Sequence, residues 1–247
     1  EQKMLSFLEK SVKPFNKEFR GFPVDRGGEG PGFFLLNGTY MAIDGNVYYG
    51  IIRSSRPRTI VEIGCGFSTL LAAAAIQKNH SEDSSWQTNL YTIDPYPPHA
   101  LRERLEQESI LIKKPVQSVP LEFFEALTDG DILFLDSTHV LKSGGDVWYE
   151  YCEIIPRLPG GVLVHVHDVS LPKPYPRTYY ENRLYWNEQY LLQALLTNNS
   201  RVETLWAGNY LMTKFPDRMA SEFDPEFHQM RALYPHSEPT AFWFRIN

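Results

Sequence analysis

Short apolar runs recur along the chain, and segments with a helical spacing of apolar residues separate them. Runs of this length that do not alternate with polar residues are typical of strands buried on both faces of a parallel sheet. They predict strands at residues 60–63, 90–94, 110–112, 131–136 and 161–168. Helices are expected at residues 44–53, 70–76, 100–108, 121–127 and 146–155, the first with Asp44 as a candidate N-cap. Strands that alternate with helices in this way predict an α/β fold with right-handed crossovers.

The two ends of the chain have different patterns. Residues 1–43 combine a short expected helix at residues 4–8 with a segment rich in glycine, proline and charge, which we interpret as an arm. This arm is expected to lie over the sheet edge or the mouth of a ligand site, or to bind a partner. Residues 44–247 are expected to form one domain around a single α/β core. Towards the end, two further strands are predicted around a polar helical excursion, at residues 202–205, with 210–212 as an optional continuation, and at residues 241–245.

The composition narrows the class of protein. Hydrophobic residues make up 43% of the chain and charged residues 22%, as in soluble globular proteins. A net charge of −6 disfavours nucleic acid as a partner. The sequence has no apolar run of membrane-spanning length and no secretory leader, so no membrane partner is expected. Cys65 and Cys152 form no closely spaced pair, which favours a reduced, cytoplasmic protein.

The chain starts at Glu1 rather than Met, which indicates a processed protein or a domain of a longer one. A homo-oligomer and a place in a larger biosynthetic assembly both stay open.

The first predicted strand runs into the turn Gly64-Cys65-Gly66 and then into a segment that favours a helix. Two glycines permit a tight turn and close approach of the backbone to a ligand. A strand, a glycine turn and a helix form the nucleotide-facing unit of a doubly wound sheet. An ordinary tight turn without a ligand is the alternative.

The residues around this turn distinguish between nucleotides. A dinucleotide-binding site requires a third glycine, where this chain has Thr69, and an acid about 20 residues further on at the end of a strand, where this chain has Asn79, His80 and Ser81 with no strand before them. We interpret residues 79–87 as a polar loop. The chain instead has Glu62 inside the first strand and Asp94 at the end of the second. Asp94 can accept both hydroxyls of a ribose, while Glu62 can meet an ammonium group or brace the glycine turn.

This arrangement resembles the S-adenosylmethionine site of class I methyltransferases. The resemblance implies a Rossmann-like fold, a seven-stranded mostly parallel sheet with helices on both faces and an antiparallel C-terminal strand pair. Candidate cofactor-binding residues lie at the glycine turn and beyond the following strands: Glu62, Gly64, Cys65, Gly66, Ser68, Asp94, Gln117, Ser118 and Asp136.

Polar residues also follow the fourth and fifth predicted strands, as Asp136 with His139 and as His167 with Asp168. Ligands of open α/β sheets bind beyond the carboxyl ends of the strands, at the point where the strand order reverses. We expect Asp136, His167 and Asp168 to hold a divalent ion, Mg²⁺ or Mn²⁺ with Fe²⁺ as a further candidate, because an imidazole moves the preference away from Mg²⁺. His139 is the candidate general base, with Asp136 as a second catalytic residue.

Simpler roles are open for the same residues. Asp136 can cap a helix, Asp168 can initiate a turn, and transfer can proceed by acid–base chemistry or proximity without a metal. His165 is expected to be a hydrogen-bonded histidine of the core rather than a ligand.

The Asp-x-x-His pattern, with a pair of ligand positions ending the fifth strand, is similar to the metal-dependent macrocin-type O-methyltransferases, which modify sugar hydroxyls on macrolides. On that resemblance Asp136 and Asp168 match metal ligands and His139 matches the base. His167 departs from the pattern, because that family has a carboxylate there. The resemblance covers residues 44–197, and catechol-type O-methyltransferases match less well.

A segment rich in proline and tyrosine leaves the fifth strand at the expected site. Prolines keep it irregular but stiff, and tyrosines offer flat amphipathic faces. We interpret residues 169–187 as a lid insertion that recognises a ring-bearing acceptor through Tyr179, Arg183 and Trp186, with a helix starting near Arg183. A rigid crossover packed on the sheet is the alternative.

Together these features predict an S-adenosylmethionine-dependent O-methyltransferase that acts on a small-molecule hydroxyl of a sugar, a phenol or a polyketide-type natural product. A metal-independent methyltransferase of another acceptor and a non-catalytic nucleotide-binding module are alternatives. A nicotinamide oxidoreductase is disfavoured by Thr69 and by the position of Asp94.

Overall fold

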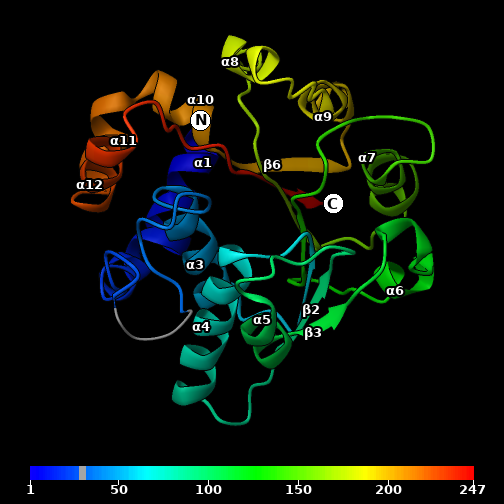
Figure 1. The fold of residues 1–247 in the computed structure, drawn as a ribbon, viewed down its shortest axis with the longest axis horizontal. Coiled ribbons are helices and arrows are strands. Elements are labelled where there is room, and N and C mark those ends of the chain that lie inside the picture. Colours follow the sequence, from blue (N-terminus) through cyan, green and yellow to red (C-terminus); the bar gives the residue numbers. More distant parts are fainter. Residues whose placement is uncertain (28–31) are drawn as a thin grey trace.

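The computed structural model describes residues 1–27 and 32–247, and seven strands in these ranges form one sheet in the order β3-β2-β1-β4-β5-β7-β6 (Figure 1). The strands β1 to β5 run parallel, and β7 runs antiparallel to both β5 and β6. Their bounds are β1 Thr59–Ile63, β2 Asn89–Ile93, β3 Ile110–Ile112, β4 Ile132–Leu135, β5 Leu163–Val166, β6 Val202–Ala207 and β7 Phe242–Ile246. The last strand inserts beside the fifth, so the predicted Rossmann-like methyltransferase fold is confirmed.

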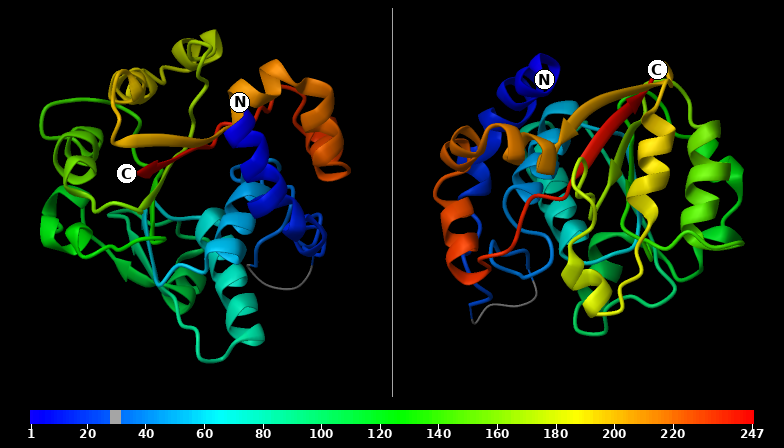
Figure 2. Two further views of the ribbon diagram at one scale, coloured as in Figure 1. Left: turned by 180° about the vertical axis from the view of Figure 1, so that it is seen from behind. Right: turned by 90° about the horizontal axis from the view of Figure 1, so that it is seen from above.

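Helices cover both faces of this sheet, as Figure 2 shows. On one face the side chains of the first helices share a core with the N-terminal arm and with the late helices; on the other face a second core joins the remaining helices to β4, β5 and β7. The helices are α1 Gln2–Phe7, α2 Asn16–Phe19, α3 Asp44–Ser55, α4 Phe67–Glu82, α5 Arg102–Glu108, α6 Leu121–Glu125, α7 Asp146–Tyr149, α8 Arg177–Glu181, α9 Glu188–Leu196, α10 Gly208–Lys214, α11 Pro216–Glu222 and α12 Glu226–Leu233. Within the described part of the chain, every helix is too short or too polar to pass through a lipid bilayer.

Three element predictions were wrong at their boundaries. The helix α4 continues to Glu82, so part of the predicted polar loop is helical, because buried Asn79 donates a hydrogen bond to the carbonyl oxygen of Ile52 in α3 (2.9 Å). Residues 210–212 lie in α10 and do not continue β6. The helix α9 begins at Glu188 instead of near Arg183, which lies in irregular backbone with a φ of 60°.

The N-terminal arm packs into the first core. Leu8, Val12 and Phe19 are fully buried, and the arm crosses α3 at Gly50. A Cβ atom on that glycine would lie 2.7 Å from the Cα atom of Val12, so the crossing requires glycine. The division at residue 43 stays a prediction, and residues 28–31 of the predicted arm lie outside the described residues.

Arg53 joins the arm to two helices from a buried position in α3. Its Nε atom lies 2.7 Å from Glu18 in α2, and one terminal nitrogen lies 2.6 Å from Glu82 in α4. Its other terminal nitrogen donates to the side chain of Asn79, and the guanidinium lies over the ring of Phe15. A buried guanidinium that is paired in this way is costly to remove, because its partners are left without compensation.

Arg53→Met is therefore expected to lower the free energy of unfolding by roughly 2–4 kcal/mol. Arg56→Met is the matched control. Arg56 contacts the same Glu82 at 3.0 Å, but its side chain is 36% exposed, so its loss should cost less than about 1 kcal/mol. Urea unfolding of both variants measures the difference. Equal costs would mean that Arg53 does not join these elements.

Candidate functional site

The glycine turn brings the end of β1 against the end of β4. Gly64 has a φ of 91°, and its N–H donates to the carbonyl oxygen of Ile93 (3.0 Å). A Cβ atom on Gly64 would lie 2.2 Å from the carbonyl oxygen of Asp136. Only glycine fits this backbone conformation and this contact, so the turn and Asp136 are neighbours as predicted.

Glu62 braces the turn from beneath. It is fully buried, accepts a hydrogen bond from the Tyr48 hydroxyl (2.8 Å) and accepts another from the Thr69 hydroxyl. The Thr69 oxygen in turn accepts the N–H of Gly66 (3.1 Å). Of the two predicted roles, the structure therefore favours bracing over contact with the cofactor. Thr69, predicted only as the position of a missing glycine, joins Gly66 to Glu62 through its hydroxyl.

Burial raises the pKa of Glu62 to about 8, although the hydrogen bonds from Thr69 and Tyr48 act in the opposite direction. This carboxyl group is therefore protonated in the fold at neutral pH.

Two cavities open beside the turn. One, of about 230 Å³, lies between the ends of β1, β2 and β4 and is lined by Gly64, Asp94, Gln117 and Asp136 among others. The other, of about 510 Å³, lies over the turn and is lined by Cys65, Gly66 and Ser68 together with Asp136, His167 and Asp168. Asp136 borders both. We call them the strand-end cavity and the turn cavity.

Ser118 is the one predicted cofactor residue that the structure places elsewhere on the surface. Its hydroxyl donates to the carbonyl oxygen of Pro115 (2.7 Å), and it faces a separate hollow beside Lys114 and Phe123. The short helical turn at residues 116–118 points Gln117 towards the strand-end cavity and Ser118 away from it.

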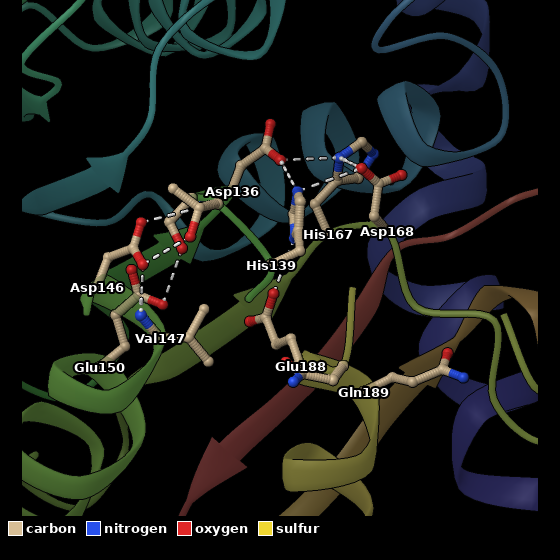
Figure 3. A network of polar contacts seen from close by, with 12 residues as sticks. Asp136, His139, Asp146, Val147, Glu150, His167, Asp168, Glu188 and Gln189 are labelled. Atoms are coloured by element: carbon tan, nitrogen blue, oxygen red, sulfur yellow. Dashed lines mark hydrogen bonds and ion pairs between the residues drawn. The ribbon is translucent and has the colours of Figure 1, made fainter. Parts of the chain in front are cut away.

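Asp136, His139, His167 and Asp168 converge at the ends of β4 and β5, and we call them the Asp–His group (Figure 3). Asp136, His139 and Asp168 each offer one ligand atom, and these atoms lie within 4.8 Å of one another. The Nδ1 atom of His167 lies 3.3 Å from Asp136 Oδ1. No helix begins at Asp136, so the structure does not support its role as a helix N-cap.

Two members of the group have strained backbone. His139 has a φ of 58° and Asp168 a φ of 57°, in the left-handed region that residues with a side chain rarely occupy. Such conformations persist only where the surrounding structure enforces them, and they gather at functional sites.

Each histidine has a carboxylate on its far side. The Nδ1 atom of His139 lies 2.8 Å from Glu188 at the start of α9, and both side chains are buried. The Nε2 atom of His167 lies 3.9 Å from Asp44 and 3.4 Å from the Thr240 hydroxyl. Asp44 does not cap its helix as predicted; its carboxylate accepts the backbone N–H groups of Thr240 (2.8 Å) and Ala241 (3.1 Å).

The charges of the group shift its pKa values. Burial opposes the charged forms, but the aspartates nearby raise the pKa of His167 to about 9, and hydrogen bonds to Asp136 and Glu188 raise the pKa of His139. The pKa of Asp136 is lowered by His167 and His139 against the effect of burial. Without an ion, the two imidazoles are therefore protonated and neutralise the aspartates.

His165 is a core residue, as predicted. It is fully buried between Phe134 and Trp243, at ring-centroid distances of 4.1 and 4.6 Å. Its two ring nitrogens have no hydrogen-bond partner among the described residues, contrary to the expected hydrogen bond. Burial lowers its pKa well below the usual range.

A third cavity, of about 740 Å³, opens on the other side of the Asp–His group, and we call it the lid cavity. His167 and Asp168 line it together with Tyr179 from the predicted lid. Trp186 packs between Tyr179 and His139, at ring distances of 4.9 and 4.4 Å. Arg183 is exposed and does not line the cavity.

The sequence comparisons agree with this geometry. Residues 61–169 match the model of a family described as a methyltransferase domain. The central part of the chain is therefore similar to a methyltransferase domain. The match begins in β1 and ends just after Asp168, so it contains the glycine turn and the whole Asp–His group, and it supports the predicted enzyme class.

An uncharacterized protein from Archaeoglobus fulgidus is 35% identical over 102 residues. The aligned segment spans 40% of this chain and 44% of that relative's length. Similar solved structures include a cmcI Mg-SAM structure, which is 16% identical with a TM-score of 0.37 and covers 76% of this chain and 75% of that one. The cyclase SpnF is 17% identical with a TM-score of 0.43, over 99% of this chain and 96% of that one.

Glu62→Gln is expected to remove a pH-dependent loss of stability. In the folded protein the carboxyl keeps its proton up to a pKa of about 8, whereas its ordinary value is 4.5. The folded state therefore binds more protons than the unfolded state in this window, and stability falls as the pH rises through it, by up to roughly 4 kcal/mol. Urea unfolding at both ends of the window should show the variant gaining on the wild type at the higher pH. A constant difference would rule out a buried neutral acid.

Proposed function

We propose that the protein is an S-adenosylmethionine-dependent O-methyltransferase of a small molecule. One observation carries the proposal: the Asp–His group lies where the donor-side cavities meet the lid cavity. Asp136 borders the strand-end and turn cavities, while His167 and Asp168 border both the turn cavity and the lid cavity. A donor and an acceptor bound in these spaces meet at the polar group.

The donor fits the spaces on the β1 side. Asp94, beyond β2, accepts the N–H of Tyr96 (2.7 Å) on one oxygen and lies 3.4 Å from the Cys65 sulfur on the other, so it is fixed at the edge of the strand-end cavity. A carboxylate there suits the ribose hydroxyls of a nucleoside. The turn cavity, lined by Gly66 and Ser68, then takes the amino-acid end and brings the methyl group towards Asp136.

In the reaction, an acceptor oxygen attacks the methyl carbon as the carbon–sulfur bond breaks, and the sulfonium leaves as a neutral thioether. Because the donor is already activated, the protein has to orient both partners and take the proton of the acceptor hydroxyl. Orientation can contribute roughly 7–11 kcal/mol, and a general base about 10²–10⁴-fold in rate. His139 is the predicted base: its Nε2 atom lies 3.4 Å from Asp136 and from Asp168 at the border of these cavities, and it has to lose its own proton before it can accept one.

The Asp–His group also suits a divalent ion, because Asp136, His139 and Asp168 each offer one ligand atom within 4.8 Å of the others, and His167 lies 3.3 Å from Asp136. When bound, such an ion lowers the pKa of an acceptor hydroxyl and orients it. The same group without an ion is the metal-independent alternative, in which protonated histidines balance the aspartates.

The lid cavity favours a hydroxylated, ring-bearing acceptor. Tyr175 and Tyr179 stack at 5.8 Å along its wall, and Asn209, Lys173 and Glu238 give it a polar side. A sugar, a phenol and a hydroxylated polyketide all match this combination of flat apolar faces and hydrogen-bonding groups.

The donor assignment is tested by calorimetry with S-adenosylmethionine and S-adenosylhomocysteine. Gly66→Leu and Asp94→Ala should lose at least tenfold in affinity, because the first fills the turn cavity and the second removes the ribose acceptor. Gly66 has open space at its Cβ position, so the variant should fold. Ser118→Ala is the matched control and should bind as the wild type does. Saturation with NAD and no heat with either sulfur nucleoside would contradict the proposal.

The lid assignment is tested by Trp186→Ala. The tryptophan packs on both His139 and Tyr179, so its loss should raise the acceptor KM several-fold and leave the affinity for the donor unchanged. Tyr180→Ala is the control, because that ring is 52% exposed. The acceptor is the best substrate from a methyl-transfer screen of phenols, glycosides and polyketides. An unchanged KM would favour a rigid crossover that does not contact the acceptor.

A further inference from the structure

The last residues of the N-terminal arm form part of the wall of both the donor and the acceptor spaces. Gly38 and Thr39 line the turn cavity as well as the lid cavity, and Tyr40 lines the turn cavity beside them. Because one segment borders both spaces, its side chains can contact a molecule bound in either. The arm therefore contributes to the ligand site.

Tyr40 is held firmly in this wall. The side-chain amide of Asn37 accepts the N–H of Tyr40 (2.8 Å) and donates to its carbonyl oxygen (2.8 Å), so the backbone is fixed on both sides of the residue. The centroid of the Tyr40 ring lies 5.0 Å from that of His167 and 5.7 Å from that of Phe134. Only 2% of the residue is exposed. The ring is thus in place before a ligand binds.

The hydroxyl of Tyr40 is buried without a hydrogen-bond partner among the described residues. Its neighbour Tyr48, whose ring centroid lies 6.0 Å away, shows how the fold normally treats such a group, because that hydroxyl donates to Glu62 (2.8 Å). A buried hydroxyl without a partner destabilises a fold, so an orphan of this kind requires an explanation. On a residue that lines a ligand cavity, a bound ligand supplies the missing partner.

The donor has suitable groups for this hydroxyl. In the proposed function the turn cavity takes the amino-acid end of the donor, which carries an ammonium and a carboxylate. A tyrosine hydroxyl can accept a hydrogen bond from the first or donate one to the second, and bonds to charged groups are stronger than bonds between neutral ones. The hydroxyl of Thr39, which lines the same cavity, already donates to the side chain of Asn37 (3.2 Å).

We propose that the Tyr40 hydroxyl binds the amino-acid end of the donor, so that the N-terminal arm completes the donor site. This inference rests on the proposed function, since it takes the donor to be S-adenosylmethionine. The bond forms only when the ligand is present. The hydroxyl therefore contributes to donor affinity and not to the stability of the ligand-free fold, which separates a ligand contact from a structural role.

Tyr40→Phe removes this one oxygen and keeps the ring. In calorimetry with the full chain, S-adenosylhomocysteine should bind the variant roughly tenfold or more weakly than the wild type, as expected for the loss of a hydrogen bond to a charged group. The affinity for 5′-methylthioadenosine, which lacks the amino-acid end, should be the same in both proteins. Both ligands are neutral at sulfur, so the comparison isolates the amino-acid end.

The melting temperature of the ligand-free protein provides a second readout. Tyr40→Phe should melt at the temperature of the wild type or above it, because the oxygen that it loses has no partner. Tyr49→Phe is the matched control. Tyr49 is also buried, but its hydroxyl is bonded to Glu18 (3.1 Å) and the residue lines none of the three cavities of the site. This variant should melt at a lower temperature and bind S-adenosylhomocysteine as the wild type does.

The outcomes separate this inference from the proposed function. If Tyr40→Phe binds S-adenosylhomocysteine as tightly as the wild type, the hydroxyl does not contact the donor, and the inference fails while the proposed function stands. An equal loss of affinity for 5′-methylthioadenosine would also overturn the inference, because the contact would then lie outside the amino-acid end. A wild-type protein that binds neither S-adenosylmethionine nor S-adenosylhomocysteine would overturn both.

Discussion

The contact between Gly64 and the carbonyl oxygen of Asp136 is the constraint on which the site depends. It lies where β1 and β4 end side by side, and a single added carbon at Gly64 would approach that oxygen to 2.2 Å. This contact fixes the depth at which β4 ends and so places Asp136 at the border of two cavities. The register of β4 with β5 then carries His167 and Asp168 to the same edge, because Leu135 pairs with Val166.

The first residues of α9 hold the loops above that edge. The carbonyl oxygen of His139 accepts the N–H of Asn187 (3.0 Å), whose side chain accepts the N–H of Leu141 (2.6 Å). Two residues later, Gln189 accepts the N–H of Ser170 (2.8 Å) and donates to the carbonyl oxygen of Lys173 (3.2 Å). Glu188, which lies between Asn187 and Gln189 in the chain, contacts the Nδ1 atom of His139. One helix start therefore fixes both the loop after β4 and the first residues of the segment that follows β5.

Local signals made the strands, the glycine turn and the strand-end acids predictable. Apolar runs such as 132–135 have few other interpretations, and Gly64 and Gly66 mark a turn by themselves. The partners of the histidines were not predictable, because they are far apart in the sequence: Glu188 lies 49 residues from His139, and Thr240 lies 73 residues from His167. The error at residues 210–212 has a related cause, since a short apolar run has no period that separates a strand from a buried helix. Ser118 faces a different hollow from Gln117 because one step along this tight helical turn rotates the side chain by about 120°.

Charge balance explains how the four side chains of the Asp–His group can lie close together without an ion. Its two aspartates and the two acids behind its histidines carry four negative charges when ionised, and two imidazolium ions leave a net charge of −2. One divalent ion with two neutral imidazoles leaves the same −2. Two protons and one ion therefore leave the same net charge. Because ligand histidines must lose their protons, binding of an ion strengthens as the pH rises. Glu188 contacts the far nitrogen of His139 at 2.8 Å, and the Thr240 hydroxyl contacts the far nitrogen of His167 at 3.4 Å, so the near nitrogen of each ring is the one that faces the aspartates.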